Sequence, residues 1–209
     1  MNIICVLKSG GIYDASWVEK LRNGVARNFT RKHKFICLTD MEVPCETIKL
    51  THGWPGWWSK IELFKPGVIT EDTLYLDLDT VVTGSLDELS KVDCDFAMLQ
   101  NFNNPEMVGS GVMWFSKVPH KVYEKFVKQP EAYIKHYERN ADGSYLGDQA
   151  FIWDTLGRNI DFITDRFMGI KSYKRNCRKF LPEDSKIVCF HGEPRPTQVK
   201  TEWMERHWA

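Results

Sequence analysis

The sequence predicts an α/β fold in which helices cover both faces of a mixed, mostly parallel sheet. Two observations predict it: short apolar runs of strand type alternate with segments of helical spacing, and many of these runs are apolar on both faces. The 209 residues suffice to bury a core, and no linker, repeat or low-complexity tract divides them. We therefore expect one domain over residues 1–209.

Each expected element has a local signal. The β-branched run 2–7 stops at a glycine loop, and the next segment, 15–29, places apolar residues at helical spacing. Ser59 can cap a short helix that Pro66-Gly67 ends. The expected strands are 2–7, 34–38, 48–50, 74–82, 96–99, 112–115, 160–164 and 187–190, and the expected helices are 15–29, 59–64, 119–137 and 148–156.

Composition limits the classes of partner and location. Lys plus Arg and Asp plus Glu each total 28, so the net charge is zero and gives no support to a nucleic-acid partner. No apolar run approaches the roughly 20 residues of a membrane-spanning helix, so we expect no transmembrane segment. The six cysteines lie mostly in apolar runs without a C-x-x-C pair, which predicts free thiols and a cytoplasmic location. Nothing in the sequence predicts the oligomeric state.

Polar clusters follow the ends of four expected strands. They are Ser9-Gly10, Thr39-Asp40, Asp77 with Asp79, and His191. Parallel sheets bind ligands in the crevice beyond the carboxyl ends of their strands. We therefore expect these clusters to meet in one place and to form the functional site.

The stretch 74–82, LYLDLDTVV, ends an apolar run in two carboxylates. In a strand, residues i and i+2 share a side, so Asp77 and Asp79 can converge while Leu78 packs the other way. Two close carboxylates repel unless a cation lies between them or one takes up a proton. Their oxygens suit Mg²⁺ or Mn²⁺, and one imidazole from His191 would favour Mn²⁺.

The same stretch also matches another enzyme class. An apolar strand followed by D-L-D-T-V is similar to the opening motif of the haloacid-dehalogenase-like phosphatases, in which Asp77 would be the nucleophile and Asp79 a general acid. That motif normally opens the domain, whereas 76 residues precede it here. The acidic motif expected downstream is also absent at the required spacing, since Gly147-Asp148 is followed by the next Asp only at 154.

Six motifs in order resemble the metal-dependent nucleotide-sugar glycosyltransferases of the GT-A (Rossmann-like) fold, most closely glycosyltransferase family eight, the glycogenin-like family. A strand and short loop with Tyr13 resemble the nucleotide-binding opening of that family. The later motifs are W-S-K-I-E-L-F (58–64), D-L-D with its continuation T-V-V-T-G-S-L-D-E-L (77–89), V-G-S-G-V-M-W-F (108–115), L-G-D-Q-A-F (146–151) and F-H-G-E-P-R-P (190–196).

The resemblance implies a reaction and a set of site residues. The reaction is transfer of a sugar from a nucleoside diphosphate sugar, expected to be UDP-linked, to a hydroxyl of a glycan or other acceptor, with retention. Gln149 or Asp148 would lie near the reacting face of the sugar. The implied metal ligands for Mn²⁺ (or Mg²⁺) are Asp77, Asp79 and His191. The implied donor-binding residues are Leu7, Ser9, Tyr13, Lys60, Asp77, Leu78, Gly109, Ser110, Gly192 and Arg195.

The chain also departs from the family pattern. Gly109 stands where the family usually has Asn, so either one contact to the donor sugar is missing or Asn103 or Asn104 supplies it, and the identity of the sugar is left open. His191 is followed at once by glycine, and Arg195 replaces Lys. These departures leave open a second hypothesis, a nucleotide-sugar or glycan binding protein with impaired catalysis. Further positive charge is available from the basic cluster Lys171, Lys174, Arg175, Arg178 and Lys179.

Overall fold

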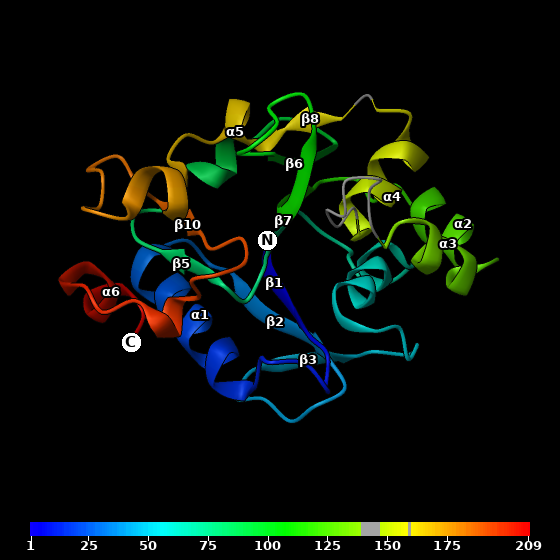
Figure 1. The fold of residues 1–209 in the computed structure, drawn as a ribbon, viewed down its shortest axis with the longest axis horizontal. Coiled ribbons are helices and arrows are strands. Elements are labelled where there is room, and N and C mark those ends of the chain that lie inside the picture. The colour runs from blue at the N-terminus through cyan, green and yellow to red at the C-terminus, as the bar shows by residue number, and fades with distance from the viewer. Residues whose placement is uncertain (139–146, 159) are drawn as a thin grey trace.

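Two β-sheets form the centre of the protein (Figure 1), whose computed structural model describes residues 1–138, 147–158 and 160–209. In these residues the larger sheet has seven strands in the order β3-β2-β1-β4-β7-β6-β8, and the smaller sheet has three in the order β5-β10-β9. The strands are β1 (Asn2–Leu7), β2 (Lys34–Thr39), β3 (Glu46–Lys49), β4 (Thr73–Leu76), β5 (Thr80–Val82), β6 (Phe96–Gln100), β7 (Val108–Phe115), β8 (Asp161–Phe162), β9 (Ile170–Ser172) and β10 (Ile187–Cys189).

Helices of several kinds connect these strands. They are α1 (Ala15–Asn28), η1 (Gly56–Phe64), η2 (Asp87–Lys91), α2 (Lys121–Phe126), α3 (Pro130–His136), α4 (Gly147–Leu156), α5 (Ile163–Arg166), η3 (Tyr173–Cys177), η4 (Pro196–Gln198) and α6 (Glu202–His207). Of these, η1, η2 and η4 are 3₁₀-helices, and η3 is a single π-helical turn. None of the helices in the described parts of the chain combines the length and the apolar character needed to cross a bilayer.

The larger sheet is mixed and mostly parallel. Strands β3, β2, β1 and β4 pair in parallel, whereas β7 runs antiparallel to both of its neighbours, β4 and β6. The carboxyl ends of β1, β2 and β4 therefore lie along one edge of the sheet. This arrangement confirms the expected fold class.

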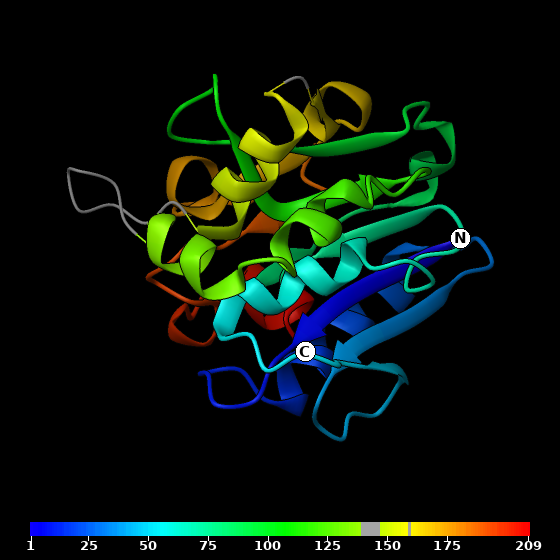
Figure 2. The same ribbon diagram turned by 90° about the vertical axis from the view of Figure 1, so that its right-hand side faces the viewer.

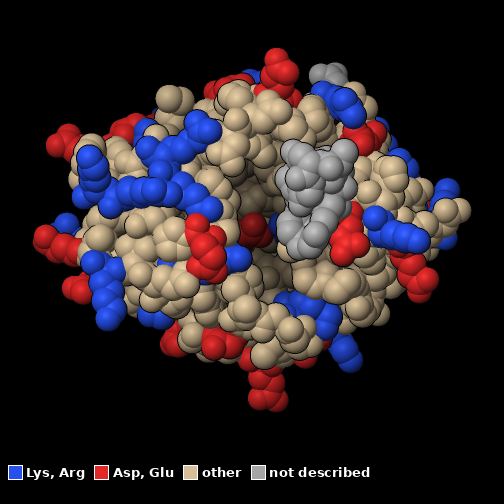
Figure 3. Space-filling model, viewed as in Figure 1, with Lys and Arg blue, Asp and Glu red and all other residues tan. Residues whose placement is uncertain are grey.

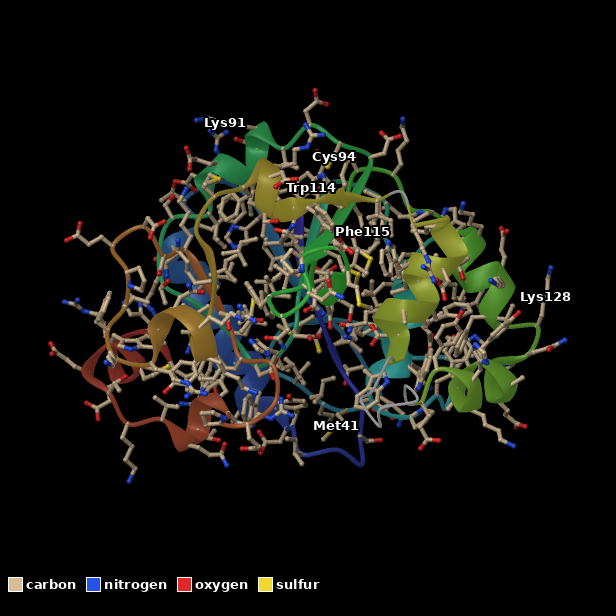
Figure 4. The ribbon with its side chains drawn as sticks, turned by 45° about the horizontal axis from the view of Figure 1, so that its top comes forward. Met41, Lys91, Cys94, Trp114, Phe115 and Lys128 are labelled. Atoms are coloured by element: carbon tan, nitrogen blue, oxygen red, sulfur yellow. The ribbon has the colours of Figure 1, made fainter. Side chains whose placement is uncertain are left out.

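Helices cover both faces of the larger sheet, and each face has its own hydrophobic core. One core lies between the sheet, helices α1 and α6, and the strands β5 and β10, and the other lies between the sheet and η1, α2 and α4, the layer that faces the viewer in Figure 2. Neighbouring residues of β7 belong to different cores: Trp114 packs into the first and Phe115 into the second (Figure 4). All six cysteines are free thiols, as expected.

The stretch 74–82 is not one strand, contrary to the prediction. β4 ends at Leu76 in the larger sheet, and β5 begins at Thr80 in the smaller one. Between them the chain turns, with the amide of Thr80 donating to the carbonyl of Asp77 at 3.1 Å. Asp77 and Asp79 therefore lie on the connection between two sheets and not on a continuous strand.

Two other predicted elements differ from those observed. The helix expected over 119–137 is split into α2 and α3, because Pro130 begins a new helix and cannot continue the old one. The strand expected over 160–164 has only two residues and leads directly into the short helix α5. The segment 170–177, which forms β9 and the π-helical turn η3, was not predicted as regular structure.

Candidate active site

A cavity of about 940 Å³ opens where β1 and β4 end and β5 and β10 approach them. Figure 3 shows it as a hollow near the middle of one face, with acidic atoms at its depth. Most of the residues predicted from the sequence line it. They are Tyr13, Lys60, Asp77, Leu78, Asp79, Gly109, Ser110, Asp148, Gln149, His191, Gly192 and Arg195.

The floor of the cavity holds a buried polar network that we call the floor cluster: Lys60, Tyr75, Asp77, Ser110 and Asp148. The ammonium of Lys60 lies 2.8 Å from the hydroxyl of Ser110, 3.3 Å from Oδ1 of Asp77 and 3.1 Å from Oδ2 of Asp148. Tyr75 donates a further hydrogen bond to Oδ1 of Asp77. The ammonium thus donates hydrogen bonds to Ser110 and Asp77 and forms an ion pair with Asp148, whose Oδ2 accepts no hydrogen bond from a described residue.

The electrostatics of the floor cluster follow from its burial. Lys60 and Asp148 are only 6% and 4% exposed. Burial raises the pKa of Asp148, although the charge of Lys60 opposes the shift. Burial alone would lower the pKa of Lys60, but the charges of Asp148 and Asp77 outweigh it and raise the pKa. Asp148 is therefore held by an internal counter-ion and is not freely presented to the cavity.

A second group, the rim cluster, consists of Tyr13, Asp79 and Arg195. Oδ2 of Asp79 accepts hydrogen bonds from the hydroxyl of Tyr13 at 3.1 Å and from the guanidinium of Arg195. Burial raises the pKa of Asp79 to about 7, the charge of Asp77 adds to this shift, and Arg195 opposes it. The two carboxylates therefore still repel each other, despite the cation already beside each of them.

His191 is held on its own side of the cavity. Its Nε2 lies 2.7 Å from the hydroxyl of Ser172, and its ring stacks on Phe102 with the centroids 5.4 Å apart. Burial lowers the pKa of His191, and the nearby charges of Lys174 and Arg175 lower it further. The imidazole is therefore neutral at pH 7, and its Nδ1 makes no hydrogen bond with a described residue.

The three predicted metal ligands agree with Mn²⁺ in chemistry but are not gathered around one point. Oδ2 of Asp77 and Oδ1 of Asp79 accept no hydrogen bond from a described residue, and neutral imidazole nitrogen is a suitable third donor. Yet among the residues that the structure describes, no group of three or more His, Cys, Asp or Glu side chains is placed to hold a metal ion. Arg195 bonds only Oδ2 of Asp79, so an ion shared through Oδ1 would lie close to the positive charge of the guanidinium.

Glycine is required where the turn meets β7. A Cβ atom on Gly111 would lie 3.3 Å from Oδ2 of Asp77, a close approach for that carboxylate. The amide of Asp77 also donates to the carbonyl of Gly111 at 2.9 Å, which pairs the turn with β7. The second glycine of the S-G motif thus fits the position of Asp77, a role that the motif itself did not indicate.

Gln149 lines the cavity, and its side chain makes no hydrogen bond with the described residues. It follows the buried Asp148 on α4, so its position is fixed by the floor cluster. Its amide can donate and accept at the same time. Of the two predicted catalytic residues, Gln149 is therefore the one whose side chain no described residue bonds.

The first loop is placed differently from the prediction. Leu7 is fully buried in the core, and its side chain does not line the cavity. Ser9 does not line it either, because its hydroxyl and amide both bond to Asp40, at 2.7 and 2.8 Å. Lys8, which was not predicted, lines the cavity and pairs with the same carboxylate at 2.5 Å.

The loop between β6 and β7 completes the wall opposite Arg195. Asn103 and Asn104 both line the cavity beside Gly109. The carbonyl oxygen of Asn103 accepts from the guanidinium of Arg175 at 3.1 Å, which leaves its NH₂ group free to donate to a ligand. No sequence motif indicated this contact, nor the stacking of Phe102 on His191.

Comparison of the sequence with protein-family models finds no match, and neither does comparison with curated proteins. Solved structures do match. The glycosyltransferase GlyE of Streptococcus pneumoniae TIGR4 superimposes with a TM-score of 0.62 at 14% identity over 99% of this chain and 59% of its own. The bifunctional glycosyltransferase WbbM gives 0.64 at 14% identity over 93% of this chain and 46% of its own. The galactosyltransferase LgtC, in complex with donor and acceptor sugar analogs, gives 0.60 at 12% identity over 94% and 89%.

These matches concern the fold. At 12 to 14% identity a shared architecture is what the superpositions demonstrate. The chain spans 59% of the length of GlyE and 46% of that of WbbM. The chain therefore has the α/β fold of these glycosyltransferases, as its motifs predicted.

Proposed function

We propose that this protein is a glycosyltransferase that moves a sugar from a nucleoside diphosphate sugar, UDP-linked, to a hydroxyl of a glycan or similar acceptor. The observation that carries the proposal is the cavity: within one space of about 940 Å³ it brings together the carboxylates Asp77 and Asp79, the amide Gln149, and the His191-Gly192 wall. A cavity of this size suits a ligand as large as a nucleotide sugar. Its position beyond the carboxyl ends of β1 and β4 agrees with ligand binding in open α/β sheets.

We further propose that Asp77, Asp79 and His191 hold Mn²⁺ or Mg²⁺ when the donor binds. The support is chemical: two carboxylate oxygens and one imidazole nitrogen accept no hydrogen bond from a described residue, and burial and the charge of Asp77 raise the pKa of Asp79, a shift that a bound cation would oppose. A bound divalent cation would stabilise the negative charge that develops on the departing nucleoside diphosphate.

The residues of the chain would perform the other tasks. Gln149 can hydrogen-bond the transferred sugar and the incoming hydroxyl, and the floor cluster fixes it in place. Retention of configuration needs either a nucleophile below the sugar or attack from the side of the leaving group. We propose the second route, because Asp148 is occupied by Lys60 and a neutral amide is a poor nucleophile.

The two other hypotheses make different predictions. A phosphatase would attack phosphorus through Oδ2 of Asp77, since Oδ1 accepts hydrogen bonds from Tyr75 and Lys60, and it would release inorganic phosphate. A binding protein with impaired catalysis would bind the donor without releasing the nucleotide. We propose transfer in preference to these because Gln149 lines the cavity and no described residue bonds its side chain.

The experiment is a release assay with a panel of UDP-sugars and MnCl₂. We expect one donor to yield free UDP slowly without an acceptor and faster when candidate saccharide acceptors are added. Para-nitrophenyl phosphate serves as the parallel substrate for the phosphatase hypothesis. Phosphate release from that compound without UDP release from any donor would overturn the proposal, and donor binding without turnover would favour the binding protein.

A further inference from the structure

The cations that line the cavity in the described parts of the chain are already paired. Lys8 pairs with Asp40, Lys60 with Asp77 and Asp148, and Arg195 with Asp79. A diphosphate would add at least two negative charges to this partly buried and internally balanced space. Burying charge without compensation is costly, so the anion needs positive charge beyond these pairs; the proposed divalent cation would supply part of it, and a nearby side chain can supply more.

Lys174 is a cation beside the cavity that is still available. Its Nζ lies close to Gly192, at 3.4 Å from where a Cβ atom of that residue would be. Gly192 itself lines the cavity. Lys174 is part-buried and forms no hydrogen bond or ion pair with any described residue. It thus places an ammonium group that has no partner among the described residues against the wall of the site.

The two residues that precede Lys174, Ser172 and Tyr173, hold it in place. Tyr173 stacks on Phe190 with centroids 4.3 Å apart and an interplanar angle of 14°. Ser172 bonds to His191 at 2.7 Å and accepts from the amide of Arg175 at 3.3 Å, which caps the π-helical turn η3. π-Helical turns are rare and occur frequently at functional sites. The segment that carries Lys174 is therefore fastened directly to the segment that carries His191 and Gly192.

The distribution of basic side chains around the cavity agrees with this position of Lys174. Figure 3 shows basic side chains gathered to one side of the hollow, where Figure 1 draws η3. Most of them are solvent-exposed, and Lys171 is neutralised by Asp184 at 2.5 Å. Lys174 differs from the exposed residues because it is only partly exposed, and from Lys171 because it has no ion pair with a described residue and faces Gly192.

We propose that Lys174 binds the diphosphate of the nucleotide sugar, with Gly192 providing the close approach. This inference rests on the proposed function, because it assumes that a nucleoside diphosphate occupies the cavity. It assigns the contact to a lysine outside the F-H-G-E-P-R-P motif. Arg195, which that motif would suggest, is paired with Asp79 in this structure.

The test compares UDP with uridine, which lacks the diphosphate, by isothermal titration calorimetry in about 0.15 M salt. The variant is Lys174→Met, and its matched control is Lys179→Met, which removes the same charge from an exposed lysine of the same segment without a bonding partner among the described residues. We expect Lys174→Met to weaken UDP binding at least tenfold and to leave uridine binding within twofold. Lys179→Met should change neither affinity by more than twofold.

The possible failures are distinguishable. If the wild-type protein binds UDP and Lys174→Met binds it within twofold of that affinity, the inference is wrong while the proposed function stands. Equal losses in both lysine variants would show a general effect of surface charge and would also overturn the inference. If the wild-type protein binds neither UDP nor uridine, with or without Mn²⁺, the proposed function itself fails.

Discussion

The floor and rim clusters both pair a cation with a carboxylate, but the two cations differ in burial and in the number of their partners. In the floor cluster, Lys60 has three partners and lies almost entirely out of solvent. In the rim cluster, Arg195 holds Asp79 through one nitrogen, and its Nε has no hydrogen-bond partner in the structure. The cation of the floor thus lies against three partners, although Oδ2 of Asp148 accepts no hydrogen bond from a described residue, whereas the cation of the rim keeps one donor, Nε, without a described acceptor.

This difference separates stability from function within one site. A buried pair that loses one partner leaves an uncompensated charge in a medium that solvates it poorly. A cation at the mouth of a cavity that bonds a single carboxylate can exchange that partner for a ligand with little change in free energy. We therefore expect changes in the floor to act on folding and changes in the rim to act on binding and turnover.

The largest effect is expected for Lys60→Met. It leaves the carboxylate of Asp148 buried without its counter-ion, which should lower the free energy of unfolding by about 3–5 kcal/mol at pH 8. Burial raises the pKa of Asp148, and the raised pKa means that stability is lost as pH rises and regained as the carboxyl is protonated. The loss measured by urea denaturation should accordingly shrink between pH 8 and pH 5.

A double variant provides the control. Combining Lys60→Met with Asp148→Asn removes both charges and should recover part of the stability that the single change loses. A double variant as unstable as the sum of the two single variants would show that the ion pair does not couple them.

The second-largest effect is expected for a change in the rim cluster, at Asp79. Asp79→Asn should lower the rate of UDP release with Mn²⁺ at least 100-fold, about 2.7 kcal/mol of activation free energy, because it removes a metal ligand. The free energy of unfolding should change by less than about 1 kcal/mol, since the carboxylate loses one ion pair but also its burial penalty. Asp165→Asn, at an exposed position, is the control for both measurements. Full activity in Asp79→Asn would contradict the proposal that Asp79 binds the metal ion.

A smaller effect in the opposite direction is expected for Arg195→Met. The guanidinium competes with a metal ion for Asp79, so its removal should tighten Mn²⁺ binding to the nucleotide-free protein about tenfold. Electron paramagnetic resonance of free Mn²⁺ measures this directly. Arg175→Met removes a guanidinium that binds Asn103 instead and should leave the affinity unchanged. Unchanged affinity in both variants would mean that Arg195 does not restrain Asp79.

The smallest effect should come from Tyr75→Phe. It removes one hydrogen bond to Asp77 while Lys60 still holds the same oxygen, so we expect a loss of about 1 kcal/mol in stability. Turnover should fall only a few-fold, because Asp77 keeps its place through the turn. A much larger loss of turnover than of stability would show that Tyr75 acts in binding or turnover, as we expect of the rim cluster, and not mainly in folding.

Sequence patterns predicted the parts of the fold that local chemistry determines. β1, α1 and β2 follow from apolar runs, helical spacing and glycine stops. The division of 74–82 did not, because neither Gly nor Pro marks the turn and every apolar residue in it is buried on one sheet or the other. The division at Pro130 did have a signal, since proline commonly begins a helix.

The sequence predicted which residues line the cavity better than it predicted which of them pair with one another. Motif order indicated Tyr13, Lys60, Asp79 and Arg195, and all four line the cavity. Which charge neutralises which depends on the distances between elements far apart in the chain, and no spacing in the sequence gives those. Lys174 was part of a run of basic residues, and only its position against Gly192 distinguishes it from exposed neighbours.

The most direct test of the central claim is a crystal structure with UDP and Mn²⁺ bound. We expect the diphosphate to lie between the floor and rim clusters, with Arg195 released from Asp79 and the contacts of Lys60 unchanged. Nucleotide bound outside this cavity, or bound inside it with the Lys60 pairs broken and the Arg195–Asp79 pair intact, would contradict the account.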